Sequence, residues 1–303
     1  MSEQTLQQKL DAAGDIVEFL RNQQVGPNVY PGVPAEYSNW RNEQKAWAES
    51  AVLFNQSYHM VELYVRGPDA FAMLLFLPGL ACDARIYAPQ LAAFPDSRAV
   101  DGYGMADTLE AMARVALDQA PASFDLFGHS MGGRVALEVF RLAPERVRRL
   151  ALVSTGIHPL REGEAEKRRT LQQVGWDNGF EALIDEWLPP MVAGTNRSDP
   201  AIYPPLRRMN VEAGQQVFDA QIHALVNRPA VDDLLPRIDC PTLVMTGALD
   251  TWSGPEQHRQ IAAAIPDAEL VIVPGAGHMI QLEAPQAVNA AIAGWLERPV
   301  RNS

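Results

Sequence analysis

Short apolar runs that alternate with stretches of helical composition constrain the fold of this chain more than any other feature. The first clear run is Met73–Leu77, closed by Pro78 and Gly79. Similar runs recur at 150–153, 243–245 and 270–273, and the helical stretches lie at 86–94, 106–119, 255–265 and 285–296. Continuous apolar runs of this length are typical of parallel strands covered on both faces. The alternation predicts an α/β fold with a doubly wound, mostly parallel sheet, whose ligands bind at the carboxyl ends of the strands.

A candidate nucleophile lies at one of these strand ends. The sequence Gly128-His129-Ser130-Met131-Gly132 follows an apolar stretch at 123–127 and precedes a helical stretch at 133–142. A serine on so sharp a strand-to-helix turn has an exposed hydroxyl, and glycines on both sides let the strand and helix backbones pass closely. The alternative is a glycine-rich loop of an ordinary α/β domain. The strand, turn and helix that follow one another without a gap favour Ser130 as a nucleophile.

An acid and a base follow the serine in the order that this architecture requires. Asp250 comes after the strand at 242–246 through Gly247-Ala248-Leu249, and His278 comes after the next strand through Gly275-Ala276-Gly277. A serine hydroxyl needs a base within hydrogen-bond reach, and the base needs an acid to orient it. Taken alone, Asp250 would be interpreted as a turn former and His278 as a solvated loop residue. Their joint arrangement predicts a Ser130–His278–Asp250 catalytic triad.

Two backbone N–H groups are candidates for stabilising the oxyanion that forms when the serine attacks a carbonyl. One belongs to Met131, the residue after the nucleophile, and the other to Leu80, just past Pro78 and Gly79. Because only the backbone serves in this role, we expect a side-chain change at Leu80 to reshape the pocket more than it weakens the oxyanion hole.

Residues 156–230 interrupt the alternation. They contain helical stretches at 180–188 and around Arg207 to Val226, several prolines, and no apolar strand. An excursion of this length predicts a helical lid over the strand ends. Its aromatic residues either line an apolar pocket or hold the lid to the body, and Arg207 with Arg208 either clamps a substrate carboxylate or forms a solvated face. The substrate-binding candidates are Trp187, Arg208 and Trp252.

The first 70 residues differ in character from the rest. Apolar spacing predicts a helix over 6–20, a second helix over 40–53 and a strand over 58–66. The sequences at 38–44, 51–57 and 59–70 closely resemble the start of the folate-dependent aminomethyltransferase and aromatic O-demethylase family. Since the likeness ends near residue 70 and that family builds its folate site on a far longer domain, we expect no tetrahydrofolate site. The extension is expected to pack on the core or to mediate a homo-oligomer.

Residues 73–297 resemble the α/β-hydrolases that carry a helical lid. The likeness lies in Leu77-Pro78-Gly79-Leu80, the Gly-His-Ser-Met-Gly sequence, 247–250 and 275–278. The resemblance implies the same triad, no metal and no organic cofactor. It also implies a core made of residues 71–155 and 231–303, with the lid between them.

Charge and composition exclude several classes of partner. The formal net charge of −12 repels a phosphate backbone, so we expect no nucleic-acid partner. Cys82 and Cys240 form no close metal-binding pair, which predicts reduced thiols in a cytoplasmic protein. Residues 1–20 contain four acidic residues and no uninterrupted apolar run, so we expect neither a signal peptide nor a membrane anchor.

These features predict a serine hydrolase that acts on a small-molecule carboxylic ester, or on a thioester or lactone. The fold leaves carbon–carbon bond hydrolysis and cofactor-free lyase chemistry open, because each uses a similar triad. A non-enzymatic alternative is an interaction module of the folate-family type joined to an inactive hydrolase body.

Overall fold

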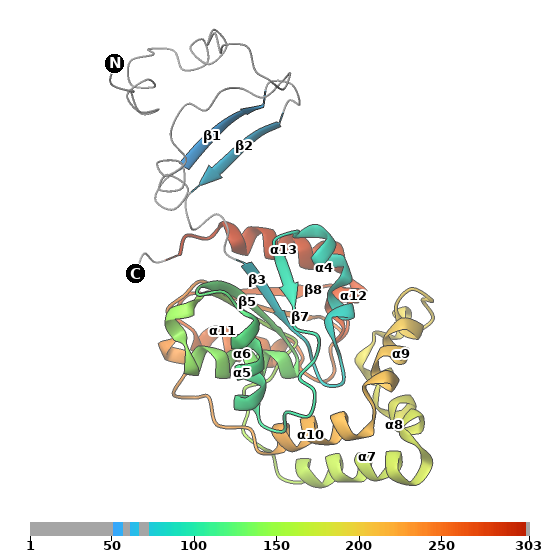
Figure 1. Ribbon diagram of the computed structural model, residues 1–303. Coiled ribbons are helices and arrows are strands. Elements are labelled where there is room, and N and C mark those ends of the chain that lie inside the picture. Colours follow the sequence, from blue (N-terminus) through green and yellow to red (C-terminus); the bar gives the residue numbers. More distant parts are fainter. Residues whose placement is uncertain (1–50, 57–60, 67–72, 301–303) are drawn as a thin grey trace, which may run out of the picture. The chain divides into compact units, whose positions relative to one another are not determined.

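The computed structural model describes residues 51–56, 61–66 and 73–300. The chain divides into two compact units, Met1–Ala72 and Met73–Ser303. Each unit is considered by itself (Figure 1).

The described part of the first unit is a strand pair. Strands β1 (Ala51–Gln56) and β2 (Val61–Arg66) are antiparallel, with Ala51 opposite Arg66. The predicted strand over 58–66 contains β2, whereas the helix predicted to reach residue 53 is wrong over its last three residues, where β1 lies. Apolar β-branched and aromatic residues such as those at 52 and 54 take a strand when a partner strand pairs with them. The helix predicted over 6–20 lies outside the described residues.

The second unit is built on a six-stranded sheet in the order β4-β3-β5-β6-β7-β8, in which all neighbours are parallel. The strands are β3 (Met73–Leu77), β4 (Ser97–Ala99), β5 (Phe124–His129), β6 (Val147–Val153), β7 (Thr242–Gly247) and β8 (Ala268–Val273). Every residue of β5 and β7 is buried, as expected for strands covered on both faces. The predicted α/β fold is confirmed.

Helices cover both faces of this sheet. Figure 1 shows α4 (Ala88–Ala93) and α13 (Pro285–Glu297) on one face, and α5 (Leu109–Gln119), α6 (Met131–Leu142) and α11 (Pro255–Ala264) on the other. Shorter helical segments are η2 (Ala84–Tyr87), η3 (Pro144–Arg146), η6 (Leu235–Arg237) and α12 (Ile280–Glu283). Among the described helices, none combines the length and the apolar character that crossing a bilayer requires.

Strand β6 is longer than the apolar run at 150–153 predicts, because a buried ion pair interrupts the apolar pattern. Arg149 of β6 donates from Nη1 to Asp125 Oδ1 on the neighbouring strand β5 over 3.1 Å, and both side chains are buried. Arg149 therefore belongs to the strand and forms an ion pair with the neighbouring strand.

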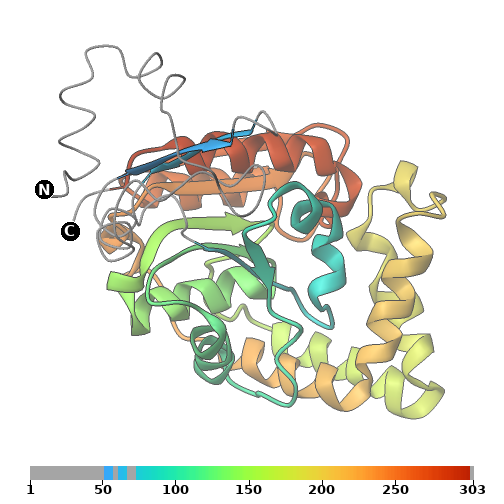
Figure 2. The same cartoon turned by 45° about the horizontal axis from the view of Figure 1, so that its top comes forward.

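An insertion joins β6 to β7. It contains α7 (Glu164–Asn178), α8 (Phe180–Trp187), η4 (Pro189–Met191), η5 (Gly194–Asn196), α9 (Tyr203–Ala213) and α10 (Gln215–Val226). Figures 1 and 2 show α7 to α10 gathered on the side of this unit away from α13. The single long helix predicted around 207–226 is wrong. Gly214, with φ +80°, ends α9 and starts α10, a backbone conformation that glycine adopts readily.

Candidate active site

Ser130 lies on the turn between β5 and α6 in a conformation that is rare for a residue with a side chain. Its φ is 56° and its ψ is −119°. The Ser130 N–H donates to Val153 O over 2.8 Å, and Thr155 Oγ1 donates to Ser130 O over 2.7 Å. Such a backbone conformation costs about 1–3 kcal/mol and persists only where its surroundings fix it. Strand β6 and the loop after it supply that support.

The glycines on either side of Ser130 are required by the close approach of backbones. A Cβ at Gly128 would lie 2.3 Å from Gly132 O, and a Cβ at Gly132 would lie 2.1 Å from Leu77 O. Both obstacles are main-chain atoms, so no side-chain rotation would relieve the clash. The sharp turn that presents Ser130 therefore depends on these two residues.

Replacing Gly132 by alanine is expected to lower the free energy of unfolding by about 1–3 kcal/mol or more, because overpacking against the backbone forces the turn between β5 and α6 to shift. Urea unfolding followed by circular dichroism measures this. The matched control is Gly294→Ala on helix α13, where a Cβ meets nothing within 4 Å. That change is expected to be neutral or to stabilise by about 0.5–1 kcal/mol. Equal unfolding midpoints for the two variants would contradict the packing argument.

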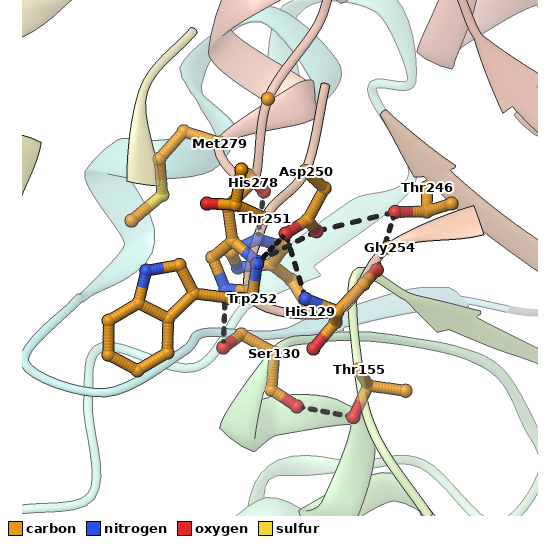
Figure 3. Close-up of polar contacts among 12 residues, drawn as sticks. His129, Ser130, Thr155, Thr246, Asp250, Thr251, Trp252, Gly254, His278 and Met279 are labelled. Atoms are coloured by element: carbon orange, nitrogen blue, oxygen red, sulfur yellow. Dashed lines mark hydrogen bonds and ion pairs between the residues drawn. The ribbon is translucent and has the colours of Figure 1, made fainter. Parts of the chain in front are cut away.

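His278 and Asp250 lie in line behind the Ser130 hydroxyl (Figure 3). His278 Nε2 is 2.8 Å from Ser130 Oγ, and His278 Nδ1 is 2.9 Å from Asp250 Oδ2. The other carboxylate oxygen of Asp250 accepts hydrogen bonds from the N–H groups of Trp252 and Ser253, each over 2.8 Å. The structure thus brings together the three residues that the sequence predicts as a triad.

The carboxyl of Asp250 is held in its ionised form. Burial alone would raise its pKa, but the neighbouring His278 and the two backbone N–H groups outweigh burial and hold the pKa of Asp250 well below its usual range. The ionised Asp250 accepts a hydrogen bond from His278 Nδ1–H, so the proton of the neutral ring stays on Nδ1. This leaves Nε2 free to accept a proton from Ser130.

His129, the last residue of β5, is a second buried histidine beside the triad. Its Nε2 lies 2.8 Å from His278 O, and because a carbonyl only accepts, Nε2 carries the proton. Burial and the nearby His278 lower the pKa of His129 to about 3, so the ring is neutral. His129 therefore positions the backbone of His278 from the end of the strand that directly precedes Ser130.

Two buried histidines are expected to make the protein less stable in weak acid. Burial lowers the pKa of His129 to about 3 and that of His258 to about 4. In the unfolded chain both titrate near pH 6.5, so between that pH and their folded values the unfolded state binds protons that the folded state does not. Stability is therefore lost as the pH falls below about 6.5, and we expect each histidine to cost about 2 kcal/mol between pH 7 and pH 5.

Urea midpoints measured at both pH values check this expectation. His258→Gln is expected to reduce the acid-induced loss by about 2 kcal/mol, since it removes one of the two groups. His223→Gln, an exposed position on α10, is the control and leaves the loss unchanged. An identical loss in wild type and His258→Gln would contradict the assignment.

The loop after β3 is shaped by side chains of the insertion. Ala81 has a φ of 54°, and its N–H donates to Gln221 Oε1 while its carbonyl accepts from Asn210 Nδ2, each over 2.7 Å. Both amide side chains are buried. They hold the peptide next to Leu80 in place, a contribution that the sequence analysis missed.

A carboxylate ties the His278 loop to the insertion as well. Glu283 accepts from Gly277 N–H over 3.1 Å, from Met279 N–H over 3.0 Å and from Ala193 N–H over 2.9 Å. The His278 N–H in turn donates to Met191 O over 2.8 Å. The segment from η4 to η5 therefore helps to position the histidine.

A cavity of about 410 Å³ opens above Ser130 between the strand ends and the insertion. Its volume is within the range of small-molecule sites. Leu80, Ser130, Met131 and His278 all line it, so the predicted oxyanion-hole residues meet the serine and the histidine here. No group of three or more His, Cys, Asp or Glu side chains in the described part of the chain is placed to hold a metal ion.

The structure brings two of the three predicted substrate-binding side chains to this cavity. Trp187 lines it and is buried, and Trp252 lines it while remaining 44% exposed, with its indole beside Ser130 in Figure 3. Arg208 is exposed on α9 and is not among the lining residues. Its neighbour Arg207 pairs with Asp185 and Glu181 on α8. The predicted arginine clamp at 207–208 therefore does not face Ser130.

A family model described as the alpha/beta hydrolase family matches residues 59–291. The chain belongs to this family. The predicted likeness of residues 73–297 to the α/β-hydrolases is confirmed. The match reaches back to residue 59, so the boundary near residue 70 falls inside it.

Two relatives match very different shares of the chain. Syringate O-demethylase from a Sphingobium species is 78% identical over 73 residues, 24% of this chain and 16% of that protein. This agrees with the predicted likeness of the N-terminal segment to the folate-dependent family. The acetyltransferase component of an acetoin-cleaving system from Pseudomonas putida is 31% identical over 77% of this chain and 61% of that protein. The chain thus spans less than two thirds of either relative.

A thermophilic esterase from Thermogutta terrifontis, solved with malate bound, is similar in structure. It is 29% identical, with a TM-score of 0.69 over 74% of this chain and 89% of that chain. The family match and this structural neighbour support a hydrolase enzyme.

Proposed function

We propose that this hydrolase cleaves a carboxylic ester by nucleophilic catalysis at Ser130, through a covalent acyl-enzyme. The observation that carries the proposal is the unbroken series of hydrogen bonds from Ser130 Oγ to His278 Nε2 and from His278 Nδ1 to Asp250. It faces a cavity of a size suited to a small molecule. The similarity to a solved esterase agrees with it.

The first half of the reaction transfers the acyl group to the enzyme. His278 takes the proton of Ser130 Oγ as the oxygen attacks the ester carbonyl, and Asp250 stabilises the imidazolium that results. The tetrahedral intermediate collapses, the bond to the alcohol breaks, and His278 returns its proton to the departing alcohol. In the second half, water attacks the acyl-enzyme with His278 again as the base, which releases the acid and restores Ser130.

The oxyanion of each intermediate is stabilised by backbone N–H groups. Met131 is the first residue of α6, so its N–H is one of those that have no partner within the helix. The second donor is Leu80 N–H, in the loop that Asn210 and Gln221 hold. Donors fixed in advance at this position gain strength in a cavity that excludes water.

The insertion at 156–230 acts as the lid of this site. Its side chains Trp187, Met191, Ile222 and Leu225 supply an apolar lining opposite the strand ends. An apolar lid favours the hydrocarbon part of a small to medium ester and keeps bulk water away from the reacting carbonyl.

A fluorophosphonate probe tests the proposal directly. The wild-type protein is expected to form a single adduct, located on the peptide that contains Ser130 by mass spectrometry, and to hydrolyse short-chain nitrophenyl esters. Heat-denatured protein is the control, because an adduct there reports general reactivity. If the native protein forms no adduct and hydrolyses no ester, the proposal is wrong. A cytoplasmic location and a homo-oligomer formed through residues 1–70 stay predictions.

A further inference from the structure

One wall of the cavity is strongly basic, although the whole chain carries a formal net charge of −12. The lining includes five cationic side chains and two carboxylates, Glu162 and Glu164. The cations are Arg134, Arg161, Lys167, Arg168 and Arg228. We call these five residues the basic wall. A local excess of positive charge in an acidic protein indicates a specific role for this wall.

Arg134 is a buried member of the basic wall that forms no ion pair with a carboxylate within 4 Å among the described residues. Its side chain is 5% exposed, its Nη2 donates to the neutral carbonyl of His158 over 2.5 Å, and its buried Nη1 has no hydrogen-bond partner among the described residues. A buried charged donor without an acceptor is costly. Burial first, and then the positive charge of Arg228, lower the pKa of Arg134 to about 9. Both effects are ones that a bound anion would offset.

Glu164, a carboxylate that lines the same cavity, already pairs with two other arginines of the basic wall. Glu164 accepts from Arg228 Nη1 and Nη2 over 2.8 and 2.6 Å, and from Arg168 Nη2 over 2.9 Å. One negative charge thus serves two cations. It orients Arg228 and Arg168 in the wall, and among the described residues it forms no hydrogen bond with Arg134.

Arg134 and the nucleophile share one cavity. Arg134 lies in the first turn of α6, the helix that begins directly after Ser130, and both residues line the cavity. A single small molecule in this cavity can therefore contact both residues.

We propose that the basic wall, through Arg134, binds a carboxylate on the substrate, so that the natural substrate is an anionic ester such as the monoester of a dicarboxylic acid. The inference rests on the ester hydrolysis proposed above and names its substrate class. Guanidinium groups suit this role because they pair with carboxylates in a fixed planar geometry.

The test compares esters that differ only in charge. Monomethyl esters of succinate, glutarate and adipate are paired with analogues whose free carboxylate is replaced by a carboxamide, and hydrolysis is followed in a pH-stat. For at least one chain length, kcat/KM of the wild type is expected to favour the acid by about 10- to 100-fold, the range for a hydrogen bond to a charged group. Equal values for acid and amide at all three lengths would overturn the inference.

Three variants assign the preference to Arg134. Arg134→Met is expected to raise KM for the acid ester and to bring the acid-to-amide ratio near 1, while Arg134→Lys keeps part of the preference. Arg208→Met, an exposed arginine outside the cavity, is the matched control and keeps the full ratio. An acid preference that persists in a folded Arg134→Met protein would show that Arg134 does not bind the carboxylate. If that variant does not fold, the acid-to-amide ratio of the wild type and its partial loss in Arg134→Lys still test the inference.

Failure of this inference is distinguishable from failure of the proposed function. Hydrolysis of the carboxamide esters without any preference for acids keeps Ser130 as the nucleophile and rejects the carboxylate site. If no ester is hydrolysed, calorimetry with glutarate tests the site alone. Binding to wild type that Arg134→Met abolishes supports the carboxylate site, and no binding to wild type rejects it.

Discussion

The Ser130→Ala protein is expected to fold normally and to lose about 10⁴- to 10⁶-fold in kcat toward ester substrates, the range seen when a serine nucleophile is removed. Among the described residues, the variant deletes the oxygen that is hydrogen-bonded to His278 Nε2, and it alters no other side chain of the cavity wall. Steady-state hydrolysis of nitrophenyl butyrate gives kcat, and thermal unfolding shows whether the fold is intact.

The matched control for this change is Ser97→Ala. Ser97 lies on β4, is not among the residues that line the cavity, and donates to Phe94 O. It is expected to keep the wild-type kcat. A Ser130→Ala rate within tenfold of wild type would mean that another group is the nucleophile.

Asp250→Asn is expected to lower kcat by about 10⁴-fold, as the equivalent change does in serine hydrolases whose histidine then adopts the wrong tautomer. The structure explains why the tautomer would change. The N–H groups of Trp252 and Ser253 point at Oδ1, so the asparagine oxygen must occupy that position and its NH₂ must face His278 Nδ1. The ring then accepts at Nδ1 and carries its proton on Nε2, where it cannot take one from Ser130.

The matched control is Asp267→Asn. This carboxylate lies just before β8 and pairs with Arg298, away from the cavity. We expect it to leave kcat and KM unchanged. A loss of less than tenfold in Asp250→Asn, with the effect confined to KM, would assign Asp250 to substrate binding.

The positions of Ser130, Asp250 and His278 could be predicted because each depends on local sequence. Each follows a short apolar run and a glycine-containing turn, and the carboxyl ends of parallel strands meet at one edge of the sheet. Strand β6 was harder to delimit, since its first half carries Arg149, whose partner Asp125 is distant in the sequence.

The substrate side of the cavity could not be predicted in the same way. Which face of each inserted helix turns inward is decided by packing over long sequence separations, so the sequence did not show that Arg208 is exposed, and Arg134 was not among the predicted residues. One signal was available, because Arg134 lies in the first turn of the helix that begins directly after the nucleophile. Asn210 and Gln221 gave no comparable signal, since their partner Ala81 is more than a hundred residues away.

The hydrogen bonds that the insertion makes to Ala81 and to the His278 loop limit how this enzyme can be re-engineered or diversified. The insertion cannot be replaced by that of another family member unless the new segment restores the acceptor at Met191 O, the donor at Ala193 N–H and the two buried amides on α9 and α10. Within the described part of the chain, helix α7 forms no hydrogen bond to either loop. Libraries that randomise α7 are therefore the ones in which altered substrate range should appear without loss of the chemistry.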